Sequence, residues 1–275
     1  MSRKLLCLSA FVSLILIAAL TISCGGSSNS NLQQGCTGGP FNVVGDWQIT
    51  ISDNGGGSAS GYGAIDSSGL ALFFDNSQAT ASTGDTVQLP KITGACSYSG
   101  DLIAYAEPGG PSSGSMITDA AQGNVTSATA INGTFTGSGS NPSGTFTLTP
   151  LTAFTGSPSA ISGPKTLLVQ GALNGQPVLL PLTSFTPTGT DASMSFTSTV
   201  TALCGATGTF TQVNTANVFD VSITLSGTGC GLTGTFTGIG FESSTDYFKD
   251  NGNNPDTYLY ADILDSTNTF VIEFF

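Results

Sequence analysis

Short runs in which apolar and polar residues alternate recur along the chain, and they constrain its fold more than any other feature. Every second residue is apolar in residues 219–225, and residues 47–52 and 194–200 follow a similar pattern. A period of two is typical of a β-strand with one buried face. Clusters such as Asp53-Asn54-Gly55 and Asn132-Gly133 separate these runs, and they suit hairpin turns.

The sequence predicts an all-β fold. Beyond the N-terminal region, no segment of useful length repeats its apolar residues with the period of a helix. Hydrophobic residues make up 39% of the chain and include 17 phenylalanines, which is enough to build a core. We therefore expect an antiparallel β-sandwich or a barrel-like body.

Internal similarity predicts two related halves. Residues 92–102 align without gaps on residues 200–210, with a cysteine at the same place in each. The motif Gly-Thr-Phe-Thr begins at Gly133, Gly144, Gly208 and Gly234. We expect its glycine at a turn or close approach, its phenylalanine in the core and its threonines on the open face. The predicted halves are residues 41–151 and 163–275, joined by residues 152–162.

The N-terminus has the layout of an export signal. Arg3 and Lys4 precede an apolar run over residues 5–20, which is 16 residues long. A membrane-spanning helix needs about 20 residues. Small residues then lead to Cys24, as in a cleavable signal. One interpretation is an ordinary secretory signal in which Cys24 stands by chance.

The segment Leu20-Thr21-Ile22-Ser23-Cys24 resembles the lipobox of bacterial lipoprotein signals, with Thr21 standing where that class usually has leucine. The resemblance implies a signal peptide over residues 1–23 and a diacylated Cys24 at the start of a flexible tether over residues 24–40. Two acyl chains would hold the protein firmly at a membrane. In that class, Gly25 in place of aspartate implies a location in the cell envelope at the outer membrane.

Charge excludes one class of partner. Beyond residue 23, three lysines stand against seventeen acidic residues, so the side-chain charge is −14. This charge repels the phosphates of nucleic acids and the headgroups of anionic lipids. We therefore expect no nucleic-acid partner, and we expect the acyl anchor to make the membrane attachment.

Four cysteines remain outside the predicted signal and anchor: Cys36, Cys96, Cys204 and Cys230. An even number in an exported chain indicates two disulfides. We favour Cys36–Cys96 and Cys204–Cys230, because each pair then lies within one half. A zinc site is the alternative, but the chain has no histidine and no CxxC pair.

Catalytic motifs are absent from the sequence. Without histidine there is no histidine-based triad, and we find no nucleophile elbow, Walker motif or dinucleotide fingerprint. We expect no cofactor, with calcium as the alternative. Hard oxygen donors lie on one Gly-bearing segment, at Asp246, Asp250, Asn253, Asn254 and Asp256. The other interpretation of this segment is a solvated hairpin loop.

Two short motifs resemble those of the lipocalin family. Gly45-Asp46-Trp47 is similar to its first motif, and Thr245-Asp246-Tyr247 is similar to its second. The resemblance implies an eight-stranded up-and-down barrel that holds an apolar ligand. From the residues alone, Trp47 is a large core side chain on the first strand, whose indole N–H needs a partner.

These observations predict a lipid-anchored bacterial envelope protein with an acidic β-rich body. Its function would be binding or envelope structure, with a glycan or protein surface as the partner. The alternatives are a calycin-like carrier of a small apolar ligand and a carboxylate-based hydrolase. We also expect residues 269–275 to form a last strand that closes the core.

Overall fold

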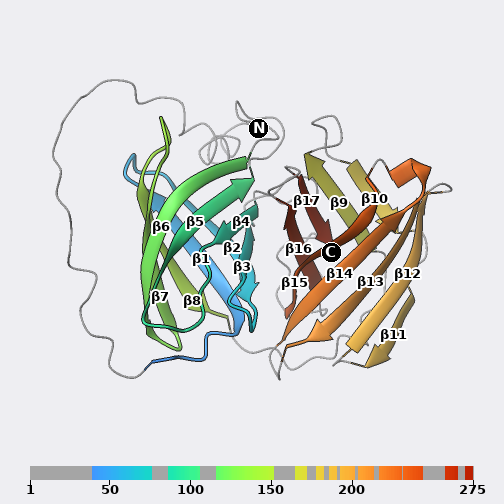
Figure 1. Cartoon of the computed structure of the whole chain (residues 1–275), viewed down its shortest axis with the longest axis horizontal. Helices are drawn as coiled ribbons and strands as arrows, with labels where there is room; N and C mark the ends of the chain where they lie inside the picture. Colours follow the sequence, from blue (N-terminus) through green and yellow to red (C-terminus); the bar gives the residue numbers. More distant parts are fainter. Residues whose placement is uncertain are drawn as a thin grey trace, which may run out of the picture.

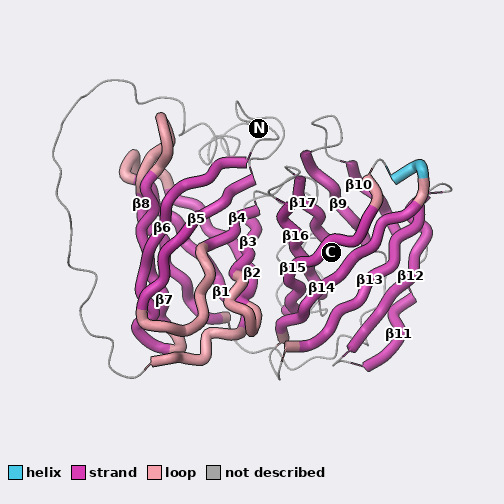
Figure 2. Tube along the Cα trace, in the orientation of Figure 1, coloured by secondary structure: helices cyan, strands magenta, loops and turns pink. Residues whose placement is uncertain are grey.

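The computed structural model describes twelve stretches of the chain. They are residues 39–75, 86–105, 116–151, 165–171, 178–182, 186–190, 193–201, 204–213, 217–230, 232–243, 258–265 and 270–274. Antiparallel strands dominate them, with one short 3-10 helix, η3, over Thr228–Cys230 (Figure 2). The predicted all-β, antiparallel class is therefore confirmed.

The first half of the chain forms a closed eight-stranded barrel (Figure 1). Each strand pairs antiparallel with the next, and β1 closes the barrel by pairing with β8. The strands are β1 (Gly45–Asp53), β2 (Ser58–Ile65), β3 (Ala71–Asp75), β4 (Thr86–Leu89), β5 (Ser97–Tyr105), β6 (Met116–Ser127), β7 (Ala130–Thr136) and β8 (Gly144–Pro150). Of the two architectures expected, this half adopts the barrel.

Aspartates fix the first two hairpin turns. The carboxylate of Asp53 accepts hydrogen bonds from the backbone N–H groups of Gly55 and Gly57, at 2.6 and 3.1 Å. The carboxylate of Asp66 likewise accepts hydrogen bonds from the backbone N–H groups of Ser68 and Leu70, at 2.8 and 2.9 Å. These are the local bonds by which aspartate favours turns. The turn chemistry expected at Asp53-Asn54-Gly55 is therefore present.

The second half forms a nine-stranded antiparallel sheet in the order β10-β9-β17-β16-β15-β14-β13-β12-β11. The last strand pairs with the first, β17 with β9, as β8 pairs with β1 in the barrel. Its strands are β9 (Lys165–Gly171), β10 (Val178–Leu182), β11 (Thr186–Thr190), β12 (Ser193–Thr201), β13 (Cys204–Gln212), β14 (Val218–Ser226), β15 (Gly234–Ser243), β16 (Tyr258–Asp265) and β17 (Phe270–Phe274).

This sheet curls until β10 also contacts β12, but β10 and β11 are its two ends. Each end strand contains a proline, Pro181 in β10 and Pro187 in β11. Proline lacks the backbone N–H that a new strand would need, so it suits a sheet edge and discourages further pairing. The second unit therefore has the strand succession of an up-and-down barrel that stays open between β10 and β11.

Each unit has its own core, and a third cluster joins them. Inward-facing residues of β1 to β8 form the barrel core, and a separate cluster on β12 to β17 forms the core of the sheet. The third cluster takes residues from the outer faces of β2 and β3 and from β14 and β15. We call this contact between the two units the seam.

Candidate functional site

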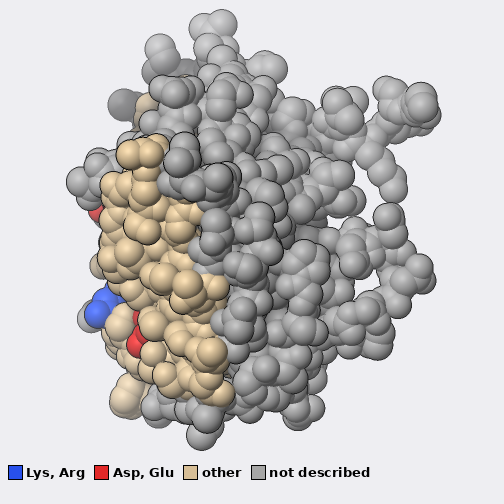
Figure 3. All heavy atoms as spheres, turned by 90° about the vertical axis from the view of Figure 1, so that its right-hand side faces the viewer, with Lys and Arg blue, Asp and Glu red and all other residues tan. Residues whose placement is uncertain are grey.

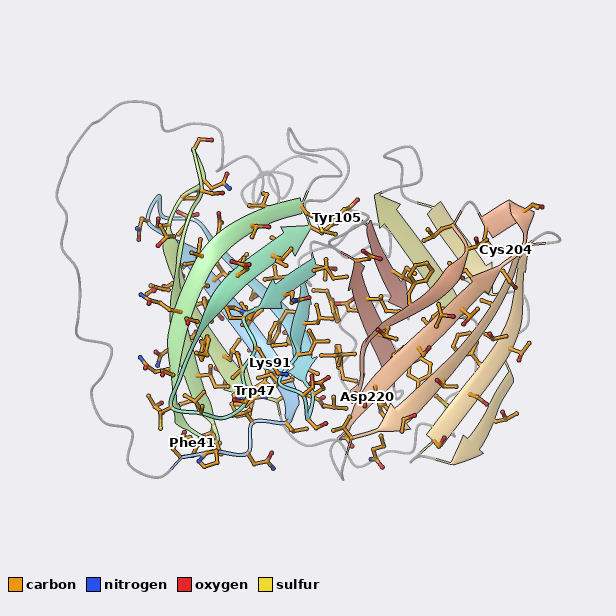
Figure 4. All side chains as sticks on the ribbon, viewed as in Figure 1. Phe41, Trp47, Lys91, Tyr105, Cys204 and Asp220 are labelled. Atoms are coloured by element: carbon orange, nitrogen blue, oxygen red, sulfur yellow. A yellow bond between two sulfur atoms is a disulfide. The ribbon has the colours of Figure 1, made fainter. Side chains whose placement is uncertain are left out.

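The predicted disulfide in the second half is confirmed. Cys204 and Cys230 are bonded, with an S–S distance of 2.00 Å and a sequence separation of 26 residues, and both lie in the core of the sheet. Figure 4 labels Cys204 at the far end of that unit from the barrel. Cys96 is also disulfide-bonded, and Cys36, its predicted partner, lies outside the described residues.

Several predicted sites fall outside the part of the chain that the structure describes. They are the anchor Cys24 with its tether up to residue 38, and the calcium ligands expected at Asp246, Asp250, Asn253, Asn254 and Asp256. Among the described residues, no group of three or more His, Cys, Asp or Glu side chains is placed to hold a metal ion. Within the same residues, no helix is long and apolar enough to cross a membrane.

Side chains occupy the interior of the barrel. Eighteen buried residues form one cluster there, and Phe73 and Phe146 are among its largest members. Tyr98 also points inward, and its hydroxyl donates to the carbonyl of Asn132 at 2.9 Å. Burial raises the pKa of Tyr98. An eight-stranded barrel is just wide enough for such side chains to fill, so its interior is a packed core.

Trp47 belongs to this core as the sequence predicted. Its side chain is buried, and the indole Nε1–H donates to the carbonyl of Val43 at 2.9 Å. The bond satisfies the indole donor inside the barrel. The motif Gly45-Asp46-Trp47 therefore begins the first strand of an eight-stranded barrel. Residues 245–247, which the second motif comprises, lie outside the described residues.

The outer face of the sheet carries a regular polar surface. Cross-strand register aligns hydroxyl residues from five neighbouring strands, β11 to β15, in two rows. The first row is Thr186, Thr197, Thr207, Thr224 and Thr235, and the second is Thr188, Ser195, Thr209, Ser222 and Thr237. We call these ten positions the hydroxyl lattice.

Neighbouring hydroxyls of the lattice bond to one another. The hydroxyls of Thr188 and Ser195 lie 2.8 Å apart, and so do those of Thr224 and Thr235. Strand geometry spaces neighbours in a row by about 4.8 Å and the two rows by about 7 Å. The lattice threonines that are exposed to solvent include Thr197 and Thr207 in the first row, and Thr188, Thr209 and Thr237 in the second. Figure 3 shows that the described part of the face it presents is almost entirely neutral.

A comparable row crosses the outside of the barrel, but its composition is mixed. It runs through Ser99, Gln122, Thr134, Thr145, Ser52 and Ser58. This row lies on a closed, curved wall and includes an amide, whereas the lattice lies on an open sheet and consists only of threonine and serine. The barrel row therefore offers a matched surface for comparison.

The row beside the lattice is acidic. It runs from Thr211 on β13 through Asp220, Ile239 and Asp262 to Glu273 on β17. Desolvation, and then the nearby charge of Asp66, raise the pKa of Asp220. Asp262 is 4% exposed, and burial raises its pKa to about 7. We call this row the acidic row, and it leads from the lattice into the seam.

Comparisons with known proteins add no relative. The chain matches no protein-family model, and no curated protein or solved structure is similar to it at the significance that the comparison requires. The candidate surfaces therefore rest on the geometry of the chain itself.

Sequence reasoning missed the lattice and the acidic row. The repeated motif Gly-Thr-Phe-Thr was a signal for the lattice, because it places threonines on the open face of several strands. The sequence also indicated that Asp262 is unusual, because it is a charged residue within the apolar stretch Ala261-Asp262-Ile263-Leu264. Neither signal shows which residues lie side by side, because that depends on strand register.

Proposed function

We propose that this chain is a lipid-anchored protein of the bacterial cell envelope, held at the outer membrane by Cys24, and that it binds a neutral polysaccharide through the hydroxyl lattice. The signal layout and the lipobox-like segment ending at Cys24 support the anchor. The observation that carries the binding function is the two-row register of threonine and serine across β11 to β15.

The chemistry of the lattice suits sugar hydroxyls. Each threonine or serine hydroxyl donates one hydrogen bond and accepts others, so a partner must offer donors and acceptors together. Sugar hydroxyls do so, and the threonine methyl groups supply apolar contact to sugar C–H groups. A phosphate or carboxylate polymer would need cations, but the lattice contains no Lys or Arg and the chain beyond the signal carries −14.

Co-sedimentation of the full chain with insoluble neutral polysaccharides, cellulose and chitin, tests the proposal. The disruptive variant is Thr207→Lys/Thr224→Lys, because these residues are neighbours in the first row of the lattice. The matched control is Thr134→Lys/Thr145→Lys, a neighbouring threonine pair on the barrel wall. Both variants add the same charge at strand positions that face outward.

We expect the wild type and the barrel variant to sediment with at least one neutral polysaccharide, and the lattice variant to lose most of its binding. Two results contradict the proposal. One is that the wild type binds none of the polymers. The other is that the barrel variant loses as much binding as the lattice variant, which would mean that any added charge has the same effect.

A second candidate function is the calycin-like carrier, favoured by the closed eight-stranded barrel with Trp47 on its first strand. Calycins hold apolar ligands inside such barrels, whereas eighteen buried side chains occupy the interior of this one. Native mass spectrometry of the full chain separates the two candidates. A non-covalently retained lipid or other apolar molecule would favour the carrier. The result we expect is the mass of the polypeptide with only its covalent acyl groups.

A further inference from the structure

The seam between the two units is small and apolar at its centre. Ala64, Leu72 and Phe74 of the barrel pack there against three residues of the sheet, which are Val218, Ile239 and Phe241. The rings of Phe74 and Phe241 stack with their centroids 5.5 Å apart. Stacked aromatic pairs of this kind stabilise a contact beyond the burial of their surface. In Figure 1 the seam lies where β2 and β3 face β15 and β16.

Strand alternation places Asp262 on this seam. Its neighbours Ala261 and Ile263 belong to the core of the sheet, so Asp262 occupies the opposite face of β16. Leu264, on that same face, packs against the seam cluster. Ile239, directly opposite Asp262 in register, is a member of that cluster. The strand also contacts β3 and β4 of the barrel, which cover this face.

Asp262 is therefore a carboxyl group enclosed between the two units. Its side chain is 4% exposed, and its Oδ2 atom is buried with no hydrogen-bond partner in the structure. An ionised carboxylate in such a place loses its hydration without a compensating partner, whereas the neutral acid is tolerated far better. The protonation state of this one group therefore affects how well the two units fit together.

Further acidic residues occupy positions in the same row as Asp262. Register sets Glu273 of β17 directly beside it and Asp220 of β14 two strands away on the same face. Asp66, in the turn between β2 and β3, raises the pKa of Asp220 by its charge. Figure 4 shows Asp220 at the boundary between the units.

The barrel side supplies no cation from its facing strands. Alternation places four titratable residues on its outer face or turns near the seam, namely Asp46, Tyr62, Asp66 and Tyr105. On β16 itself, Tyr260 occupies the position two residues before Asp262. Strands β2, β3, β4 and β14 to β17 contain no Lys or Arg, and Lys91, which follows β4, is exposed.

We propose that the seam is a pH-responsive contact: the two units stay packed together while Asp262 is protonated, and they separate along the seam when it ionises. Burial raises the pKa of Asp262 to about 7, so the change falls near neutral pH. Between about pH 5.5 and about pH 8.5 the ionised fraction of such a group rises roughly thirtyfold. This inference does not depend on the proposed polysaccharide binding.

Hydroxyl-radical footprinting of the full chain tests the proposal, because oxidation of a side chain reports its exposure to solvent. Phe73 and Phe74 are neighbours on β3 that are 1% and 3% exposed, but Phe73 faces the barrel core and Phe74 faces the seam. Phe73 is therefore an internal control for unfolding. We expect oxidation of Phe74 and Phe241 to rise several-fold between about pH 5.5 and about pH 8.5, with Phe73 unchanged.

The variant Asp262→Asn cannot ionise, so it should keep Phe74 protected at both pH values. The wild type also tests the proposal by itself, because the midpoint of Phe74 oxidation should lie near neutral pH and not near the value of an ordinary aspartate, about 4. Equal protection of Phe74 at both pH values would overturn the proposal. A pH-dependent rise that persists in Asp262→Asn, or that includes Phe73, would overturn it as well.

Discussion

Phe146 on β8 lies directly opposite Gly133 on β7, and its ring occupies the space that a side chain on Gly133 would need. A Cβ atom built on Gly133 would come within 2.8 Å of Cε1 of Phe146. A second pair of the same kind lies beside it, in which Phe135 on β7 is opposite Gly144 on β8 and its ring covers that glycine. Two adjacent Gly-Thr-Phe-Thr motifs thus pair so that each phenylalanine covers the glycine of the other.

Replacing Gly133 with alanine should therefore destabilise the barrel. The added methyl group would collide with the ring of Phe146, and overpacking of this kind costs roughly 1–3 kcal/mol. Denaturant unfolding of Gly133→Ala measures the loss. Gly205→Ala is the control, because its nearest neighbour is the flexible hydroxyl of Ser226 at 3.3 Å, and it should change stability little. Equal stability of the two variants would contradict this account of the motif.

Local pattern predicted much of this fold from the sequence. Alternation identified the strands around Trp47 and Phe219, and the repeated motif correctly assigned Phe146 and Phe210 to the core with threonines outside. These features depend on residues two positions apart in one strand, which the sequence displays directly. The pairing of Cys204 with Cys230 was also predictable, because the internal similarity divides the chain into halves and both cysteines lie in the second half.

Contacts between distant segments were not predictable in the same way. Alternation alone assigns Asp262 to the solvent face of β16, because its neighbours Ala261 and Ile263 are apolar. The structure buries that face because the barrel, formed far earlier in the chain, packs against it. The hydroxyl lattice was missed for a related reason, since a shift of one residue in register would move every threonine to the other face.

The stability of the protein should fall as pH rises through the range from about 4 to about 7. Burial raises the pKa of Asp262 from 3.8 to about 7, so in this range the folded protein holds a proton that the unfolded chain has released. The free energy of unfolding then decreases with pH, and it levels off above about 7. Urea unfolding at several pH values measures this dependence.

Asp262→Asn removes the titrating group, so it should be more stable than the wild type above pH 7, by roughly 1–4 kcal/mol. Below about pH 4, where the aspartate is protonated in both states, the two proteins should be close in stability. Asp101→Asn, on an exposed position of β5, is the matched control and should follow the wild type. A variant at Asp262 that is less stable than the wild type at every pH would contradict the assignment.

Removing the disulfide between Cys204 and Cys230 should destabilise the sheet and leave the barrel intact. The bond closes a loop with a separation of 26 residues, for which loop entropy predicts about 3–4 kcal/mol. The double variant Cys204→Ala/Cys230→Ala keeps both positions apolar within the core. Limited proteolysis should then cut within β12 to β15 before it cuts within β1 to β8. Cleavage that begins in the barrel would show that the two units do not unfold separately.

Deletion of residues 271–275 should unfold the second unit alone. These residues include most of β17, which pairs on one side with β16 and on the other with β9, so their loss breaks the sheet between those two strands. Ile272 is fully buried, and the core of the sheet loses it as well. Trp47, the one tryptophan of the chain, lies in the barrel and therefore reports on that unit by fluorescence.

We expect circular dichroism to lose strand signal while the fluorescence transition of Trp47 persists. A truncated protein in which both signals still melt in one cooperative transition would show that β17 is not needed to close the sheet.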